Sequence, residues 1–495
     1  MNGPDLLPLV FMLPLVVAAL LPALALKRPE LSWALALTAA LVTAGVAAVL
    51  TATLGESLAL RYPVGGWAAP LGIELVFDRL SAFTIVFSGV TALALVFSRT
   101  LAGGLGPRPA LFHALVLVNL GGLNGFAVAG DLFNLFVFME LLSVSAYALV
   151  AAGRGSGSAL AALKYLLPGA VSSLLVLFSI GVVFALTGSL NMADVAERLG
   201  PAGAPAATAL AVALFASGFM IKAALFPLHF WLPDAHSAAP GPVSALLSAL
   251  VVKVGVIGLI RGQLLFGEAA APALSQVLML LGAVAIVAGA VAATVQSELK
   301  RLLAYSTVSN VGYIALGLGL ATTASVAGSL VHVGYHGVTK AGVFLAAAAL
   351  IERTGLHDIE DLRGLGHRMP WSAAAISAGM VALAGVPPSA AFVGKWQIAL
   401  GALEAQQPVL IAVILGGALL ALGYGIRVIN ALFFRSPTHA RVVAAREAPP
   451  STVLPLVVLV GLALSAGLTG ALMIDFVGPV ATAIVGAIAE TPGGR

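Results

Sequence analysis

The chain has 495 residues, of which 60% are hydrophobic and only 9% are charged, and its mean hydropathy is +1.08. Soluble domains carry about 25% charged residues, because polar groups must cover their surface. The composition therefore excludes a soluble protein and predicts a polytopic membrane protein. The absence of cysteine excludes disulfides and thiolate chemistry, and a net charge of +4 spread over single Lys and Arg residues argues against a nucleic-acid interface.

Apolar runs of about 20 residues, the length that crosses a bilayer as a helix, follow one another along the whole chain. We expect an all-α fold with about fourteen such spans. The first run lacks a basic segment before it, so we interpret it as a span and not as a cleaved signal. The tail 477–489 is too short to cross alone, so we expect it to extend or flank the last span. The predicted spans are 5–26, 32–54, 76–98, 110–128, 131–152, 163–187, 206–228, 241–265, 272–296, 302–321, 326–350, 372–400, 408–434 and 452–475.

The basic residues are distributed unequally between the two sides of this fourteen-span arrangement. Cytoplasmic loops of membrane proteins carry an excess of Lys and Arg, so the richer side is expected in the cytoplasm and both termini outside. The richer side collects Lys27, Arg28, Arg99, Arg108, Arg154, Lys164, Lys300, Arg301, Arg353, Arg363, Arg368, Arg435, Arg441 and Arg446. The other side collects Arg61, Arg79, Arg198, Arg261 and Arg495.

Two of the predicted spans contain pairs of prolines, which interrupt helices and free backbone carbonyls. Pro227 and Pro233 should break the seventh span, and Pro387 and Pro388 should break the twelfth. Paired interrupted spans are typical of transporters built from inverted repeats.

We therefore expect an N-terminal three-helix segment (1–105), two inverted five-helix repeats (106–268 and 269–436, spans 4–8 and 9–13) and a C-terminal helix with its tail (437–495). In this arrangement Lys222 and Lys395, one in each broken span, occupy equivalent positions.

No loop is long enough for a soluble catalytic domain, and no phosphate-binding loop, dinucleotide fingerprint or HExxH motif is present. The activity is therefore expected to lie within the bilayer and to need no cofactor. Ionisable residues at membrane depth cost at least a few kcal/mol each, so their default interpretation is functional. Glu140 lies about ten residues into the fifth span, near mid-membrane. The alternative is a protonated Glu140 that only hydrogen-bonds a neighbouring helix.

Three lysines lie within predicted spans. Lys222 precedes the prolines of the seventh span, where it either exchanges a proton or extends to the membrane interface. Lys253 is flanked by apolar turns on both sides and is too deep for such extension. Lys395 follows the prolines of the twelfth span.

His332, His336 and Lys340 recur at intervals of four residues, which places them on one face of the eleventh span. Two histidines at this spacing also suit zinc, but no acidic residue is near in sequence and the lysine would repel a cation. We therefore predict no metal and interpret the three residues as a proton relay.

Other polar residues receive structural interpretations. His113, Asn119 and Asn124 are expected to form hydrogen bonds between helices. Lys300 and Arg301, with Glu298, are expected to form a charged cap at the cytoplasmic surface.

Several segments resemble the antiporter-like proton-translocating subunit family, found in complex I, membrane-bound hydrogenases and Mrp-type Na+/H+ antiporters. The resemblance covers spans 4 to 13. It rests on residues 131–150 (DLFNLFVFMELLSVSAYALV), 186–196 (LTGSLNMADVA), 222–256, 297–313, 332–345 (HVGYHGVTKAGVFL) and 385–396 (GVPPSAAFVGKW). Within the family, the first two segments are most similar to the D-type subunit of Mrp antiporters.

The resemblance implies fourteen helices with broken helices 7 and 12. It also implies roles for named residues: Glu140 and Lys222 form a pair, Lys253 is the central lysine and Lys395 the exit-side lysine. His332, His336 and Lys340 fall on the family's relay.

The implied function is proton translocation, with sodium as a second candidate ion, beside other membrane subunits in the plasma membrane. The alternatives are a proton-pumping subunit of a hydrogenase or complex I-type enzyme and, on weaker grounds, a self-sufficient solute transporter.

Overall fold

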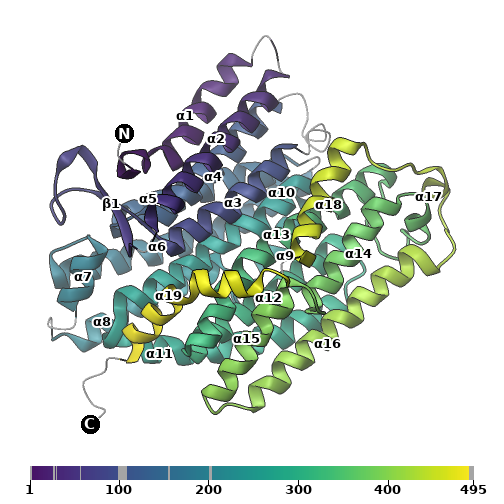
Figure 1. Ribbon diagram of the computed structural model, residues 1–495. Coiled ribbons are helices and arrows are strands. Elements are labelled where there is room, and N and C mark those ends of the chain that lie inside the picture. Colours follow the sequence, from purple (N-terminus) through teal and green to yellow (C-terminus); the bar gives the residue numbers. More distant parts are fainter. Residues whose placement is uncertain are drawn as a thin grey trace.

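The computed structural model describes residues 3–25, 28, 30–55, 57–97, 109–153, 156–199, 203–465 and 467–489, and its helices pack into one bundle (Figure 1). The longer helices of the first half are α1 (Leu9–Leu24), α2 (Leu31–Leu54), α3 (Arg79–Phe97), α4 (Pro109–Val128), α5 (Leu132–Ala151), α6 (Ser156–Thr187), α8 (Pro205–Lys222) and α11 (Val252–Thr294). Those of the second half are α12 (Leu299–Leu320), α13 (Thr323–Thr354), α14 (Pro370–Ala384), α15 (Ala390–Glu404), α16 (Val409–Ile429), α18 (Pro450–Ser465) and α19 (Gly470–Ala489).

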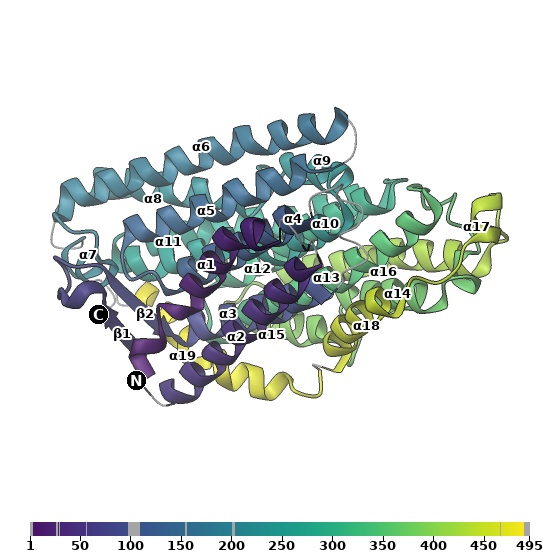
Figure 2. The same ribbon diagram turned by 90° about the horizontal axis from the view of Figure 1, so that it is seen from above.

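Shorter elements lie between these helices or run directly into them, as α10 and η4 run into α11. They are η1 (Gly3–Leu6), β1 (Ala59–Pro63), η2 (Val64–Gly66), β2 (Glu74–Asp78), α7 (Met192–Leu199), α9 (Trp231–Ala238), α10 (Gly241–Leu246), η4 (Leu247–Val251), η5 (Leu365–His367), η6 (Asn430–Phe434) and α17 (Ala440–Ala444). The strands β1 and β2 form an antiparallel hairpin that the sequence did not predict. This hairpin and α7 lie at one end of the bundle, and α17 lies at the other (Figure 2).

The basic residues that the sequence assigned to opposite sides lie on segments at opposite ends where the structure describes them. Arg61 and Arg198 lie on β1 and α7, whereas Arg441 lies on α17. Five basic residues of that prediction lie outside the described residues: Lys27, Arg99, Arg108, Arg154 and Arg495.

Twelve helices among the described residues are long and apolar enough to cross a membrane, and three apolar helices are shorter. All fourteen predicted segments contain helical residues, which confirms the all-α membrane architecture, while the count of fourteen crossings stays a prediction. The last predicted span was wrong. The predicted span 452–475 is two helices, α18 and α19, and the tail 477–489 belongs to the second.

The helix α19 runs from mid-bundle to one end. Gly470 at its start lies against Val393 of α15, and Ala487 near its finish lies beside Gly267, where φ of +36° kinks α11. Because α18 leads from α17 toward that starting point, the two helices together traverse the bundle (Figure 1). The tail looked too short because its helix begins seven residues earlier, within the segment assigned to the previous span.

Both predicted helix interruptions are present. The first lies between α8 and α9, where Ala224 adopts a positive φ of 52° and Pro227 follows. Pro233 does not contribute to it, because this proline lies in the first turn of α9, a position that tolerates proline. The second interruption separates α14 from α15 and contains Pro387 and Pro388.

The equivalence predicted for Lys222 and Lys395 is wrong with respect to these interruptions. Lys222 is the last residue before its break, whereas Lys395 is the sixth residue of the helix that follows its break. The boundaries of the two proposed repeats stay predictions.

The centre of the bundle is formed by α10, the first part of α11, α12 and α13. The most apolar 18-residue window of Gly241–Gly267 is 100% buried, and the corresponding windows of α12 and α13 are 94% buried. By contrast, only 28% of the α1 window and 17% of the α19 window are buried. These central helices carry Lys253, His332, His336 and Lys340 at depth, because polar groups in a membrane protein face other helices.

Small residues allow the broken helix to approach this centre. A Cβ on Gly255 of α11 would lie 2.1 Å from the backbone nitrogen of Ala223, next to Lys222. The contact fixes the position of the α8 terminus relative to Lys253, two residues away on α11.

We predict that Gly255→Ala lowers the melting temperature of the purified protein, because overpacking against backbone costs about 1–3 kcal/mol. Gly181→Ala on α6 is the matched control, since a Cβ there meets no atom within 4 Å. Its melting temperature should stay equal or rise slightly. A Gly255→Ala protein as stable as the control would contradict this packing.

Candidate functional site: a buried line of amines and imidazoles

The first part of the site joins α5, α6 and α8. The Lys222 side chain is 5% exposed, and its Nζ donates to Ser143 Oγ at 2.7 Å. Its Nζ lies 3.7 Å from Glu140 Oε1, and Ser173 of α6 donates to the same carboxylate. Lys222 therefore does not extend to the membrane interface; it is held inside the bundle between two serine hydroxyls and one carboxylate.

Glu140 itself lies at the outer surface of this single chain. Its side chain is 34% exposed at mid-helix, on a face that also presents Phe133, Val137 and Val144 of α5. A carboxylate at this depth is costly beside lipid. The face of α5 that carries Glu140 therefore requires a polar group beside it to shield the carboxylate from lipid.

The second part of the site lies where α11 faces α13. Lys253, 4% exposed, donates to the Ser248 carbonyl at 2.7 Å and lies 2.7 Å from His336 Nδ1. Ser248 belongs to the π-helical turn η4, an irregularity that often occurs at functional sites. Its hydroxyl also contacts Thr307 of α12 at 2.9 Å. The π turn thus supplies the acceptor that holds the central lysine.

The predicted alignment of His332, His336 and Lys340 is confirmed in part. All three side chains are at most 1% exposed, and the two imidazole rings stack with centroids 5.8 Å apart. Lys340, however, turns toward α12, where its Nζ donates to the Leu303 carbonyl at 2.7 Å and to Ser306. The two histidines therefore contact each other, whereas Lys340 hydrogen-bonds to α12 and acts on the histidines only through its charge.

The line continues from His332 to α15. His332 Nε2 lies 3.1 Å from Asn310 Oδ1, and its ring centroid is 6.0 Å from that of Tyr313. The Lys395 amine lies 4.2 Å from the Tyr313 ring centroid and donates to the Leu383 carbonyl at 2.8 Å. A lysine thus stands at the far end, stabilised by a ring face and by the carboxyl end of α14.

These groups can exchange protons with one another or with water. Within the part of the chain that the structure describes, Lys253, Lys340 and Lys395 form no ion pair. Of the four lysines of the site, Lys222 is the one with a described carboxylate within 4 Å. Neutral amines and imidazoles each offer one lone pair and at least one N–H, so every member can accept a proton on one side and release one on the other.

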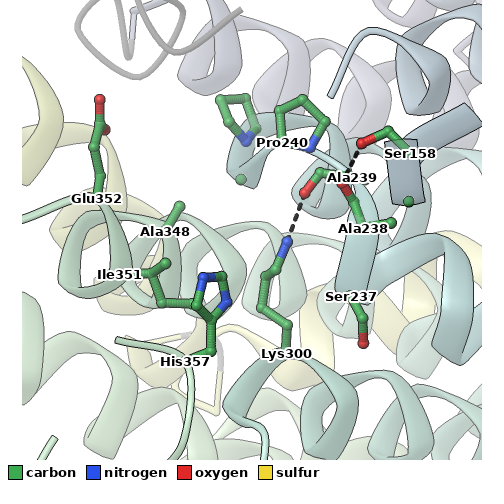
Figure 3. A pocket seen from close by; sticks show the side chains of 13 residues that line it. Ser158, Ser237, Ala238, Ala239, Pro240, Lys300, Ala348, Ile351, Glu352 and His357 are labelled. Carbon is green, nitrogen blue, oxygen red and sulfur yellow. Dashed lines mark hydrogen bonds between the residues drawn. The ribbon is translucent and has the colours of Figure 1, made fainter. Parts of the chain in front are cut away.

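One buried cation was missed by the sequence analysis. Lys300 does not form a surface cap: it is 4% exposed, and its Nζ donates to the Ala239 carbonyl at 2.6 Å. Figure 3 shows its side chain extending across a pocket of about 420 Å³ toward this carbonyl, with Glu352 and His357 on the other side. The neighbouring Arg301 is 37% exposed and pairs with Asp234 at 2.9 Å, and its location at the cytoplasmic surface stays a prediction.

Further polar residues near the site were also not singled out. His236 of α9 is fully buried and stacks on Phe344 with ring centroids 4.4 Å apart. Ser143, Ser173 and Asn310 are the hydrogen-bond partners described above. The sequence offers no signal that separates His236 and these three residues from the many other polar residues in the spans, because only their contacts with other helices distinguish them. The interhelical roles predicted for Asn119 and Asn124 are confirmed, since they donate to the Leu142 and Val10 carbonyls.

The described residues contain no group of three or more His, Cys, Asp or Glu side chains arranged to hold a metal ion. His332 and His336 stack face to face, and neither has a carboxylate beside it. This geometry offers a cation no set of converging ligands.

The fold and the buried line together define a polytopic membrane protein of the antiporter type. The family model described as "NADH:quinone oxidoreductase/Mrp antiporter, TM" matches residues 129–421. The chain belongs to this family, as its motifs suggested.

Relatives of known designation fall into two groups. The chain is 40% identical over 448 residues to NADH-quinone oxidoreductase subunit N of Desulforudis audaxviator, covering 89% of both chains. It is 30% identical over 404 residues to the D-type subunit of the Na(+)/H(+) antiporter of Alkalihalophilus pseudofirmus, covering 82% of both. Two segments had suggested a particular similarity to the D-type antiporter subunit. The whole chain is at least as similar to the N-type oxidoreductase subunit.

Solved structures show the same fold. A chain of the Mrp complex from Dietzia sp. DQ12-45-1b superposes with a TM-score of 0.90 at 24% identity, covering 99% of this chain and all of that one. A chain of the membrane-bound sulfane sulfur reductase, an archaeal respiratory membrane complex, gives 0.90 at 29% identity, covering 97% and 98%.

The contacts of Lys222 predict different effects for two serines on α5. Ser143→Ala removes the closest partner of the Lys222 amine, and hydrogen bonds to charged groups contribute about 1.5–3 kcal/mol. We expect proton transport by the native complex in membrane vesicles to fall roughly tenfold. The control is Ser145→Ala, which is equally buried but bonds Asn119 and should transport normally. Equal transport by both variants would contradict the assigned role of Ser143.

Proposed function

We propose that this chain is a proton-translocating subunit of a multisubunit membrane complex in the plasma membrane. The single observation that carries the proposal is the line Lys222–Lys253–His336–His332–Lys395, buried across the centre of the bundle and associated with one carboxylate at its edge. Buried ionisable groups in membrane proteins mark ion pathways. A series of amines and imidazoles without fixed counter-charges suits mobile protons better than a bound solute.

In the proposed mechanism, the Glu140–Lys222 pair opens and closes. Two unit charges 4 Å apart interact by about 4 kcal/mol at an effective dielectric constant near 20. That energy changes a protonation equilibrium by about three orders of magnitude. When the pair is closed, the carboxylate holds Lys222 charged; when it opens, the field at Lys253 changes and a proton moves through the histidines toward Lys395. Lys340 adjusts the field beside His336.

The exposed carboxylate supports the assignment to a larger complex. Glu140 lies on an outward face of α5, and a second membrane subunit packed there would remove it from lipid. The related chains also come from multisubunit assemblies: the Mrp complex and a respiratory membrane complex. The excess of basic residues on the segments near α17 supports a cytoplasmic location for that end and an outside location for both termini.

The driving force separates two candidate functions. As a D-type subunit of an Mrp antiporter, the chain would couple proton movement to a cation gradient. As an N-type oxidoreductase subunit, it would belong to a redox-driven complex and itself catalyse no electron transfer. The 40% identity to an N-type subunit supports the oxidoreductase candidate as strongly as the motifs support the antiporter candidate. Purifying the native complex and identifying its subunits distinguishes them: small antiporter subunits support the first, and quinone-reductase or hydrogenase subunits the second.

The proton pathway is tested by Glu140→Ala and Lys253→Ala, which remove the carboxylate and the central amine. Both variants should abolish proton transport into vesicles while the complex assembles normally on native gels. Lys164→Ala is the control, because this lysine is 52% exposed and pairs with Asp234 outside the line. Normal proton transport by both test variants would refute the scheme.

A further inference from the structure

A row of buried hydroxyls on α3 leads from Lys253 toward the end of the bundle that carries β1 and β2. Ser81, Thr84, Ser88 and Thr91 are spaced by three, four and three residues, which places them on one helix face. Their exposures are 0%, 6%, 1% and 1%. The proposed function does not use this helix, which lies outside both predicted repeats.

The inner end of the row reaches the central lysine. Thr84, Ser88, Thr91 and Lys253 line a common cavity of about 20 Å³. A cavity holds a water molecule when it offers about 10–15 Å³ or more and two to four polar partners. Ser88 also donates to Asn124 at 2.9 Å, which keeps its hydroxyl directed toward α4. The cavity thus has room for one water, with Lys253 and three α3 hydroxyls set in an otherwise apolar lining.

The outer end of the row meets an ion pair. Arg261 Nη1 donates to Asp78 Oδ2 at 2.5 Å, and its Nη2 donates to Ser81 Oγ at 3.2 Å. Ser81 in turn donates to Asp78 Oδ1 at 2.8 Å. Arg261 is two helical turns beyond Lys253 on α11, and Ile257, one turn between them, lines the 20 Å³ cavity. The first and last groups of the route are therefore carried by the same face of one helix.

On the side of the ion pair away from Lys253 lies a pocket that opens to the surface. This second pocket, of about 270 Å³, is lined by Arg61, Glu74, Asp78 and Arg261 at the β1–β2 end. The side chains of Arg61 and Asp78 are 54% and 23% exposed, so this pocket reaches the surface. Burial raises the pKa of the Asp78 carboxyl, but the charge and hydrogen bonds of Arg261, with the bonds from Ser81, outweigh it and hold the pKa below 3.8. Asp78 thus remains an anion that keeps Arg261 in place.

We propose that the α3 hydroxyls and the adjoining cavity form a second proton route, which connects Lys253 with the surface at the β1–β2 end, and that the Arg261–Asp78 pair is its gate. The inference rests on the proposed function, because it needs a proton at Lys253. In each step a hydroxyl or water accepts one proton on one side and releases another on the other side. The hydroxyls and the water then rotate back before the next proton passes. The route opens when Arg261 moves away from Ser81 and water from the outer pocket enters.

The first test removes two of the hydroxyls with little change in side-chain size. We expect Thr84→Val combined with Ser88→Ala to lower proton transport at least tenfold while the complex assembles normally. Thr43→Val is the control, since this residue is a buried hydroxyl on α2 whose Oγ1 has no hydrogen-bond partner among the described residues. Full transport by the double variant, in a complex that Lys253→Ala inactivates, overturns the α3 route and leaves the proposed function intact. Transport that survives Lys253→Ala overturns both.

The second test uses the absence of cysteine from this chain. Ag+ binds thiols and is small enough to follow water, so it should inhibit transport by Thr84→Cys when added at the β1–β2 side. Val86→Cys on the same helix is the control: its side chain is 44% exposed on the outer surface of the chain, and Ag+ should not inhibit it. The unsubstituted complex gives the baseline for thiols on other subunits. Insensitivity of Thr84→Cys to Ag+ on that side overturns the route.

Discussion

The arrangement of the helices is governed by how a buried amine is stabilised without a carboxylate. A lysine at membrane depth has lost its water, and full pairing with an acid would fix its charge. Here backbone carbonyls at helix irregularities take the place of water. The π turn η4 supplies the acceptor for Lys253, and the carboxyl end of α14 supplies two acceptors for Lys395, at 2.8 and 3.2 Å. Carbonyl dipoles stabilise a cation, yet a neutral amine leaves behind no unpaired charge.

The same constraint explains why the helices are broken where they are. An uninterrupted α14 would bond its last carbonyls internally and leave nothing for Lys395. Lys222 lies at the carboxyl terminus of α8, where its own helix end is electronegative. Lys300 uses the carbonyl of Ala239, the residue that caps α9. The amines of these buried lysines thus lie where helices end or widen into a π turn. Prolines and the π turn create these sites, and small residues let the helices pack closely around them.

Sequence reasoning identified the ionisable residues because charge is scarce, and scarcity makes each one at depth conspicuous. It could not find their partners: Lys253 and His336 are 83 residues apart, and nothing in the chain states that α11 faces α13. Lys300 was misjudged because it stands beside Arg301 at a span end, where a surface cap is the ordinary interpretation. The division between α18 and α19 was missed because its turn signals, Gly467, Thr469 and Gly470, stand within one apolar run and were assigned to the span.

In the proposed mechanism, protons pass through the Lys253 amine itself. Arginine at this position would keep the positive charge but cannot release a proton in a protein. The direct measurement is proton transport by the native complex carrying Lys253→Arg, in vesicles with a pH-sensitive dye and with assembly checked on native gels. We expect an assembled complex that transports no protons. Transport at the unsubstituted rate would show that a fixed charge suffices, and would contradict a proton path through this residue.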